Sequence, residues 1–472
     1  MVESPLMSPK VPSGHAVAPG ADSRSYQSVR IRPISRAERL ALGRELRQQV
    51  RRASIGDWRP DKHRADPVVQ IVHSHDGRLA PLIPLRVERM AASPYGFLRG
   101  ATMVMAHDFS RLPATGIRPV ICGDAHLGNF GFYASPERDL VLDLNDFDEA
   151  HPGPWEWDLR RLAVSLWIAG RQNGATEGRC GDSVTACVAS YRKTIRFLAN
   201  QPLLWRSFQR LSVGQLHLAV KEKSLRGEIA RTVAAARTST SDRALPKFTA
   251  AGGLGRQIVD RPPLITRIIG AAAERIGKAL DDYLATLAPH WRRVVAGYTL
   301  VDVAHKVVGV SSVGLRSYVA LLEGSSPDDV IFLQLKQARR SVVAKYVHGE
   351  SARHAHQGQR VVEYQQALQT VSDPLLGWTT IEGLPYFVRQ FRDMKGTIPI
   401  DAITPGALHD YARILGRLLA KGHARTSGAS MIAGYAGRSA RLDTAMKRFA
   451  RAYADQVEAD YDKFVRAASR GL

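Results

Sequence analysis

The chain has 472 residues, with 66 Lys and Arg against 44 Asp and Glu, and so carries a formal net charge of +22 at pH 7. At roughly 150 residues per domain, this length predicts a large core and two or three lobes. A hydrophobic content of 44% and a charged content of 23% exclude wholesale disorder, a collagen-like repeat and a coiled-coil rod. No run of 18 apolar residues occurs, so we predict no membrane span and no membrane partner.

The positive charge has two interpretations. Arginine accounts for 52 of the 66 basic residues, and its guanidinium matches phosphate and carboxylate oxygens, which favours an anionic ligand or a polyanion. The arginines are scattered, however, and such a composition is also typical of a GC-rich genome. A nucleic-acid partner is therefore possible but not favoured.

Cysteine usage and the N-terminus indicate a cytoplasmic protein. Cys122, Cys180 and Cys187 form no C-x-x-C pair, so neither a disulfide framework nor a zinc site is expected. Residues 1–30 are rich in Ser, Pro and Gly and lack the apolar segment of a signal peptide. We expect them to form a disordered tail.

The first part of the chain is predicted to be mainly helical. Apolar spacing predicts a helix over 36–52 and another from Trp157 onward, and residues 175–235 and 264–290 also read as helices. Short strands are expected at 117–122 and 141–142. The stretch 238–263 is the best loop candidate because it is rich in Ser, Gly and Pro.

After residue 300 the pattern changes to that of strands. Alternating β-branched stretches at 307–322 and 330–335, joined by a turn at 323–329, predict a hairpin. A helix over 359–371, a strand over 385–391 and helices in the last 65 residues follow. The predicted class is α+β, with a helical lobe over 31–300, a β-rich lobe over 301–395 and helices over 396–472 that complete the first lobe.

One constellation indicates phosphoryl-transfer chemistry. The loop Gly123-Asp-Ala-His-Leu-Gly-Asn129 follows a short strand, and Asp146 follows the next one. A carboxylate such as Asp124 can deprotonate a hydroxyl, while Asn129 and Asp146 offer the hard oxygens that Mg²⁺ prefers. Each residue alone is an ordinary turn former, and the ordered set is much rarer.

This pair of motifs resembles the aminoglycoside phosphotransferase and choline kinase branch of the protein-kinase-like fold. The resemblance implies that Asp124 is the catalytic base and that Asn129 and Asp146 are metal ligands. It also implies that Asp158 is a structural aspartate that hydrogen-bonds the catalytic loop. Cys122 stands where that branch often has a histidine, and we interpret His126 as structural.

Elements of a kinase nucleotide lobe come later in the chain. Gly309-Val-Ser-Ser-Val-Gly314 resembles a glycine-rich hairpin over phosphates, Lys336 lies on a strand, and Glu363 on the next helix could pair with that lysine. The expected nucleotide contacts are Gly309, Ser311, Ser312, Gly314, Lys336 and Glu363. Since this order runs from the first kinase strand to the helix before the catalytic loop, the hypothesis is a two-lobed, circularly permuted kinase-like fold.

The chain as a whole, over about residues 35–470, resembles domain-of-unknown-function family 2252. The segments that carry this resemblance are Ser93–Gly100, Gly123–Gly131, Asn145–Ala150, Trp157–Leu162, Leu333–Lys336, Gly358–Glu363 and Ala420–Arg425. Ser311 and Gln337 depart from the Gly and Glu that the family tends to have.

The favoured function is a Mg²⁺-dependent phosphotransferase that uses ATP or GTP and an unidentified hydroxyl-bearing acceptor; nucleotidyl transfer would use the same groups. Two other classes stay open. Asp124 and His126 form an Asp-x-His pair, which is typical of the first metal-binding motif of a two-metal phosphoesterase. The charge of +22 would also suit a non-catalytic pseudokinase-like protein or a basic nucleic-acid binder.

Overall fold

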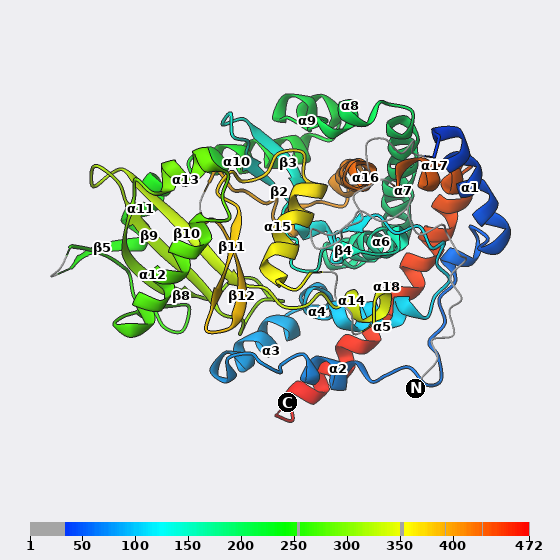
Figure 1. Ribbon diagram of the computed structural model, residues 1–472. Helices are drawn as coiled ribbons and strands as arrows, with labels where there is room; N and C mark the ends of the chain where they lie inside the picture. Colours follow the sequence, from blue (N-terminus) through cyan, green and yellow to red (C-terminus); the bar gives the residue numbers. More distant parts are fainter. Residues whose placement is uncertain (1–33, 253–254, 350–353, 392, 427, 472) are drawn as a thin grey trace.

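The computed structural model describes residues 34–252, 255–349, 354–391, 393–426 and 428–471, so the predicted tail at 1–30 lies outside the described residues. A six-stranded sheet and its covering helices lie on one side of the molecule, and a helical body lies on the other (Figure 1). The α+β class is confirmed.

The helical body contains most of the helices. Its N-terminal helices are α1 (Arg36–Gln49), α2 (Pro67–His73), α3 (Ile83–Ala91), α4 (Pro94–Gly100) and α5 (Thr102–Ser110). Its central helices are α6 (Trp155–Gln172), α7 (Glu177–Ala199), α8 (Leu203–Ser207), α9 (Val213–Ala219) and α10 (Lys223–Arg237). The C-terminal helices α16 (Ala407–Arg425), α17 (Ala429–Ala436) and α18 (Arg441–Ala468) pack against α6 and α7, as the sequence predicts.

Close helix packing builds the core of this body. Every residue of α6 from Trp155 to Gly170 is buried, as expected of a helix that is enclosed on all sides. Helices α7 and α16 approach so closely that a Cβ on Gly416 would lie 2.1 Å from the carbonyl oxygen of Cys187. A glycine at this position lets the two backbones touch.

The sheet lobe is antiparallel, with the strand order β11-β12-β10-β9-β8-β7. Its strands are β7 (Ile265–Ile268), β8 (Thr299–Lys306), β9 (Ser317–Glu323), β10 (Val330–Gln337), β11 (Gly377–Ile381) and β12 (Leu384–Gln390). The expected hairpin is present as β9 and β10, but its first strand begins at Ser317 and not at 307, because residues 307–316 form the loop between β8 and β9. The expected strand at 385–391 is β12.

The boundary expected at residue 300 is wrong, because the sheet lobe begins earlier. Strand β7 pairs with β8, and α12 (Ala271–Leu284) and α13 (Pro289–Val295) pack an apolar face onto the sheet around Tyr283 and Leu333. The stretch 238–263 is also more than a loop, since it forms α11 (Ser241–Phe248) and a hairpin of β5 (Thr249–Gly252) and β6 (Gly255–Ile258). Apolar residues on α11 and β6 cover part of the sheet's other side.

A second hairpin and one helix lie between the two parts. Strands β2 (Phe130–Ala134) and β3 (Leu140–Leu144) form a wholly buried antiparallel pair. Strand β1 (Val120–Ile121) pairs with β4 (His151–Pro152) beside it. Helix α15 (Gln357–Leu368) contacts β11, β12 and α16, and Figure 1 shows it between the sheet and the body. Short α14 (Ala344–Val347) precedes it.

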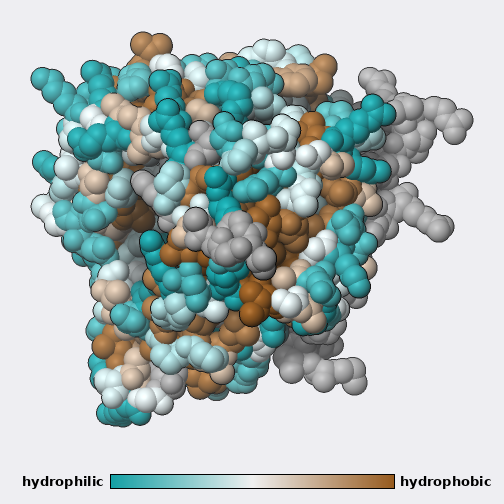
Figure 2. All heavy atoms as spheres, turned by 90° about the vertical axis from the view of Figure 1, so that its left-hand side faces the viewer, coloured by the Kyte–Doolittle hydropathy of each residue, from teal (hydrophilic) through white to brown (hydrophobic). Residues whose placement is uncertain are grey.

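The outer face of the sheet lobe carries hydrophobic residues at several places between hydrophilic ones (Figure 2). Ile269 at the end of β7 and Val294 on α13 are among the exposed apolar side chains of this lobe. Within the part of the chain that the structure describes, no helix combines the length and the apolar character needed to cross a bilayer.

Candidate functional site

A buried aspartate holds the loop that follows β1. The Oδ2 and Oδ1 atoms of Asp158, in the first turns of α6, accept hydrogen bonds from the backbone N–H groups of Cys122 and Gly123 at 2.7 and 2.8 Å. His423 Nε2 of α16 lies 3.2 Å from Asp158 Oδ2. Gly123 has a φ of +76°, and a Cβ there would lie 2.3 Å from the carbonyl oxygen of Glu149, so the turn needs glycine. Asp158 thus holds the loop as the resemblance implies.

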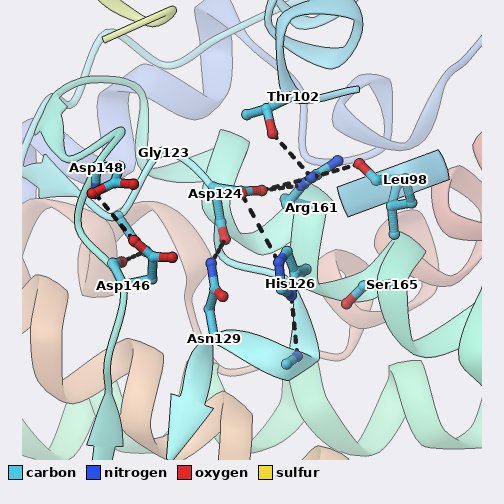
Figure 3. Close-up of polar contacts among 12 residues, drawn as sticks. Leu98, Thr102, Gly123, Asp124, His126, Asn129, Asp146, Asp148, Arg161 and Ser165 are labelled. Atoms are coloured by element: carbon cyan, nitrogen blue, oxygen red, sulfur yellow. Dashed lines mark hydrogen bonds and ion pairs between the residues drawn. The ribbon is translucent and has the colours of Figure 1, made fainter. Parts of the chain in front are cut away.

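Asp124 lies at the tip of this loop and pairs with an arginine. Arg161 Nε donates a hydrogen bond to Asp124 Oδ1 at 2.7 Å, and Arg161 Nη2 donates to the carbonyl oxygen of Leu98 at 2.8 Å (Figure 3). Burial raises the pKa of Asp124 to about 7, although Arg161 lowers it, and the nearby carboxylates of Asp146 and Glu149 raise it further. A carboxylate with a pKa near neutrality is suited to take up a proton.

The β2–β3 hairpin brings the two expected metal ligands together. Phe130 pairs with Leu144, and Asn145 N donates to the carbonyl oxygen of Asn129 at 3.1 Å, so Asn129 and Asp146 flank the same end of the hairpin. Asn129 Nδ2 donates to the carbonyl oxygen of Asp124 at 2.7 Å. The amide oxygen of Asn129 is therefore left to bind a ligand.

His126 has a structural environment, as expected. Its Nδ1 accepts a hydrogen bond from Gly128 N at 3.1 Å and lies 3.2 Å from the hydroxyl of Tyr95. His126 is buried, and its Nε2 lies 3.9 Å from Asp124 Oδ2. Nothing in this geometry favours the phosphoesterase interpretation of the Asp124–His126 pair.

Lys336 on β10 reaches across from the sheet lobe to the acidic segment after β3. Its ammonium forms an ion pair with Asp148 Oδ2, and its side chain is only 4% exposed. Burial raises the pKa of Asp146, but Lys336 and Arg389 together hold it below its usual value. Burial and the charge of Asp146 raise the pKa of Asp148. Asp146 is thus the more strongly ionised of the two carboxylates.

Glu363 does not pair with Lys336, so this expected contact is wrong. Its Oε2 lies 2.8 Å from His354 Nε2, and its Oε1 accepts a hydrogen bond from Gln359 Nε2 at 2.9 Å. Helix α15 presents Arg360 to the acidic segment instead, where it donates to the carbonyl oxygen of Asp148 at 2.8 Å.

The expected glycine-rich hairpin is the loop between β8 and β9. Gly309 and Gly314 have φ values of +69° and +85°, which favour glycine. Ser311 and Ser312 line a cavity, and Ser312 Oγ donates to Asp148 Oδ2 at 3.4 Å. The loop thus contacts the same carboxylate as Lys336.

Two arginines, Arg78 between α2 and α3 and Arg89 on α3, hold this loop through its carbonyl oxygens. Arg78 donates to the carbonyl oxygen of Ser311 at 2.8 Å and to that of Val313. Arg89 donates to the carbonyl oxygen of Gly309 at 2.6 Å. The loop is therefore anchored to the helical body.

Two cavities meet at Asp146. The larger has a volume of about 590 Å³ and is lined by Asp124, Asp146, Asp148, Ser311 and Ser312 among others. This volume lies within the usual range for small-molecule sites, roughly 300–1,000 Å³. The smaller cavity, of about 240 Å³, is lined by Asn129 and Asp146 together with Arg99, Arg389 and Lys395.

The oxygen atoms around Asp146 fit a hard divalent cation. Asp148 Oδ1 is buried and has no hydrogen-bond partner among the described residues, and Asp148 N donates a hydrogen bond to Asp146 Oδ1 at 3.3 Å. Among the described residues, no group of three or more His, Cys, Asp or Glu side chains is arranged to hold a metal ion. A cation here would therefore need oxygens from a ligand or from water as well, as Mg²⁺ commonly has.

The sequence analysis did not single out three residues of this site: Asp148, Arg161 and Arg78. The first two carried a signal. Asp148 is the second carboxylate of Asn145-Asp-Phe-Asp-Glu149, and Arg161 lies three residues after Asp158, on the same helix face. Arg78 had no such signal, because it lies more than 200 residues from the loop it holds.

The pairing of Asp124 predicts a titration that can be measured directly. We expect the Asp124 carboxyl signal in a ¹³C NMR titration to have a midpoint near pH 7. In Arg161→Gln the midpoint should move upward, because the guanidinium favours the charged carboxylate. A midpoint near pH 4 in the wild type would contradict this environment.

The comparisons with known proteins give a family and no named relative. The family described as an uncharacterized protein conserved in bacteria (DUF2252) matches residues 78–467. No curated protein matches the chain, and no solved structure does.

Proposed function

The chain belongs to the uncharacterized bacterial family DUF2252, and from the geometry of the site we propose that it is a Mg²⁺-dependent phosphotransferase. The proposed reaction moves a phosphoryl group from ATP or GTP to a hydroxyl-bearing acceptor in the cytoplasm. The observation that carries the proposal is the Lys336–Asp148 ion pair. It joins the sheet lobe to the carboxylate segment at a cavity that Asp124 also lines.

The arrangement of the two parts supports a permuted kinase-like fold. The loop with Asp124 and the strand end with Asp146 come before the sheet in the chain, whereas the loop at 309–314 and Lys336 come after them. All four nevertheless meet at one cavity or at its ion pair. Packed contacts of this kind do not depend on where a chain begins.

Each side chain has a separate part in the proposed transfer. Asp124 takes the proton of the acceptor hydroxyl on a carboxylate oxygen, and Arg161 keeps that carboxylate in position. The acceptor oxygen forms a bond to the γ-phosphorus, and the bond between the γ-phosphorus and the bridging oxygen breaks, leaving a nucleoside diphosphate. When the nucleotide binds, the Lys336 ammonium leaves its ion pair with Asp148 and binds the nucleotide phosphates instead.

Asp146 and Asn129 would hold the metal ion, and the buried Asp148 Oδ1, which has no hydrogen-bond partner among the described residues, would offer a further oxygen. When bound, Mg²⁺ supplies positive charge to the phosphate oxygens. The lowered pKa of Asp146 suits this role, because a metal ligand must be ionised.

The proposal is tested by nucleotide binding. We expect Mg·ATP or Mg·GTP to bind the wild type, and Asp146→Asn and Lys336→Met to weaken that binding at least about tenfold, the equivalent of one charge-assisted contact. Isothermal titration calorimetry measures both affinities. Asp139→Asn is the matched control, because Asp139 is a largely exposed carboxylate paired with Arg210. Absence of nucleotide binding by the wild type with either Mg²⁺ or Mn²⁺ would contradict the proposal.

A further inference from the structure

The larger cavity contains cations as well as carboxylates. Arg78, Arg339 and Lys345 line it together with Asp124. Among the described residues, none of the three cations has a carboxylate oxygen within 4.0 Å: Arg78 and Arg339 donate to backbone carbonyls, and the Lys345 ammonium lies 5.8 Å from the ring centre of Tyr346. These three cations form no ion pair with a described residue and are the positive side of a cavity whose other charged lining includes the carboxylates of Asp124, Asp146, Asp148 and Glu149.

A fourth cation lies behind this side of the cavity. Arg86 is 0% exposed, and its Nη2 donates to the carbonyl oxygen of Gly100, which lines the cavity. Its Nε and Nη1 have no hydrogen-bond partner in the part of the chain that the structure describes. Burying a guanidinium in this way is costly unless an anion compensates the charge.

Burial lowers the pKa values of two of these cations, and repulsion between neighbouring guanidinium groups lowers them further. Burial, followed by the charges of Arg86 and Arg339, lowers the pKa of Arg78 to about 9. Burial, followed by the charge of Arg339, lowers the pKa of Arg86 to about 10. An anion at this position would relieve the repulsion.

The loop at 309–314 contacts both this positive region and the carboxylate segment of the proposed nucleotide site, and all three line the same cavity. Ser312 contacts Asp148, the partner of Lys336, through its side chain. Arg78 contacts the same loop through the carbonyl oxygens of Ser311 and Val313. Arg339 and Lys345 are exposed, so the positive region opens to solvent, where a second substrate can enter.

We infer that the acceptor carries an anionic group, a phosphate or a carboxylate, which Arg78, Arg339 and Lys345 bind while its hydroxyl lies at Asp124. The inference rests on the proposed phosphotransfer, because the acceptor is defined by it. Guanidinium and ammonium groups bind both anions through charge-assisted hydrogen bonds. The substrate class is thus small hydroxy acids or phosphorylated alcohols and sugars.

The test uses inorganic phosphate and acetate as probes, titrated into the full chain at low ionic strength, first alone and then with Mg²⁺ and a non-hydrolysable ATP analogue present. We expect at least one anion to bind the wild type in both conditions, phosphate if the acceptor is phosphorylated and acetate if it is a hydroxy acid. The double variant Arg339→Gln/Lys345→Gln should bind that anion at least about tenfold more weakly. Its affinity for the ATP analogue should stay within about twofold of the wild type.

A control of equal charge change is Lys278→Gln/Arg293→Gln on α12 and α13, where both side chains are exposed on the sheet lobe. It should leave anion binding unchanged. The inference is overturned if neither anion binds the wild type, if the Arg339/Lys345 variant binds as well as the control, or if it loses affinity for the ATP analogue to the same degree. Loss of the proposed function has a different signature: the wild type binds the anion but no nucleotide.

Discussion

Asp124→Asn should lower kcat about 10²–10⁴-fold, the range typical of a lost general base, while the affinity for Mg·ATP stays within about twofold. The amide has the size of the carboxylate and can still accept a hydrogen bond from Arg161, but it cannot take up the proton of an attacking hydroxyl. Formation of ADP measures the effect, with water as the acceptor until a natural one is identified.

The same group should govern the pH dependence. Because burial raises the pKa of Asp124 to about 7, the carboxyl is mostly protonated and inactive at pH 6 and mostly ionised at pH 8. We therefore expect kcat/KM of the wild type to rise with pH up to about 7 and then to level off. The rise should be missing from the residual activity of Asp124→Asn.

Asp455→Asn is a suitable control for turnover, because Asp455 is an exposed carboxylate that also pairs with an arginine, Arg171, at 2.7 Å. It should retain wild-type kcat and the same pH profile. A kcat in Asp124→Asn equal to that of this control would remove Asp124 from the proposed mechanism. It would leave the nucleotide-binding prediction for Asp146 to be judged separately.

Asp158→Asn should destabilise the fold by about 3–5 kcal/mol, the range observed when one partner of a buried charged network is removed. Asp158 is 1% exposed and accepts from two backbone N–H groups of the loop. The side-chain oxygen of an asparagine can replace only one of the two carboxylate oxygens. Its NH₂ group, which is a hydrogen-bond donor, would then face the second backbone N–H, which is also a donor. The free energy of unfolding, measured in urea by circular dichroism, gives the effect.

The matched control is Asp182→Asn on α7. Asp182 is 69% exposed in its side chain and lies 3.4 Å from Lys447, so its loss should change the free energy of unfolding by less than about 1 kcal/mol. Equal unfolding midpoints for the two variants would mean that Asp158 does not hold the loop. Loss of turnover in Asp158→Asn at a temperature where it stays folded would show that the loop geometry also matters for activity.

Much of the site could be predicted from local patterns. The segment 123–129, the following hairpin and Asp158 lie within about forty residues, and hairpin pairing with one helix suffices to bring them together. The glycine loop and Lys336 were likewise predictable, because a turn and an alternating strand are encoded by neighbouring residues. The order of these segments along the chain is also a property of the sequence alone.

Other features depended on contacts between distant segments. Whether Lys336 pairs with Asp148 or with Glu363 depends on the orientation of α15, where Arg360 and not Glu363 faces the acidic segment. The early start of the sheet lobe could not be predicted for a similar reason. The apolar face of α12 has the same sequence pattern whether the helix packs on other helices or, as here, on a sheet.

The positive side of the cavity is the clearest case. Arg78 lies between α2 and α3, whereas Arg339 and Lys345 follow β10. No local sequence pattern near any of them indicates that they line the same cavity. Periodicity and turn residues act over a few positions, so the sequence determined the loop at 123–129, the β9–β10 hairpin and most of the helices. Which charges face each other across the cavity was decided only by the packing of the sheet lobe onto the helical body, because that packing alone brings residues hundreds of positions apart within reach of one ligand.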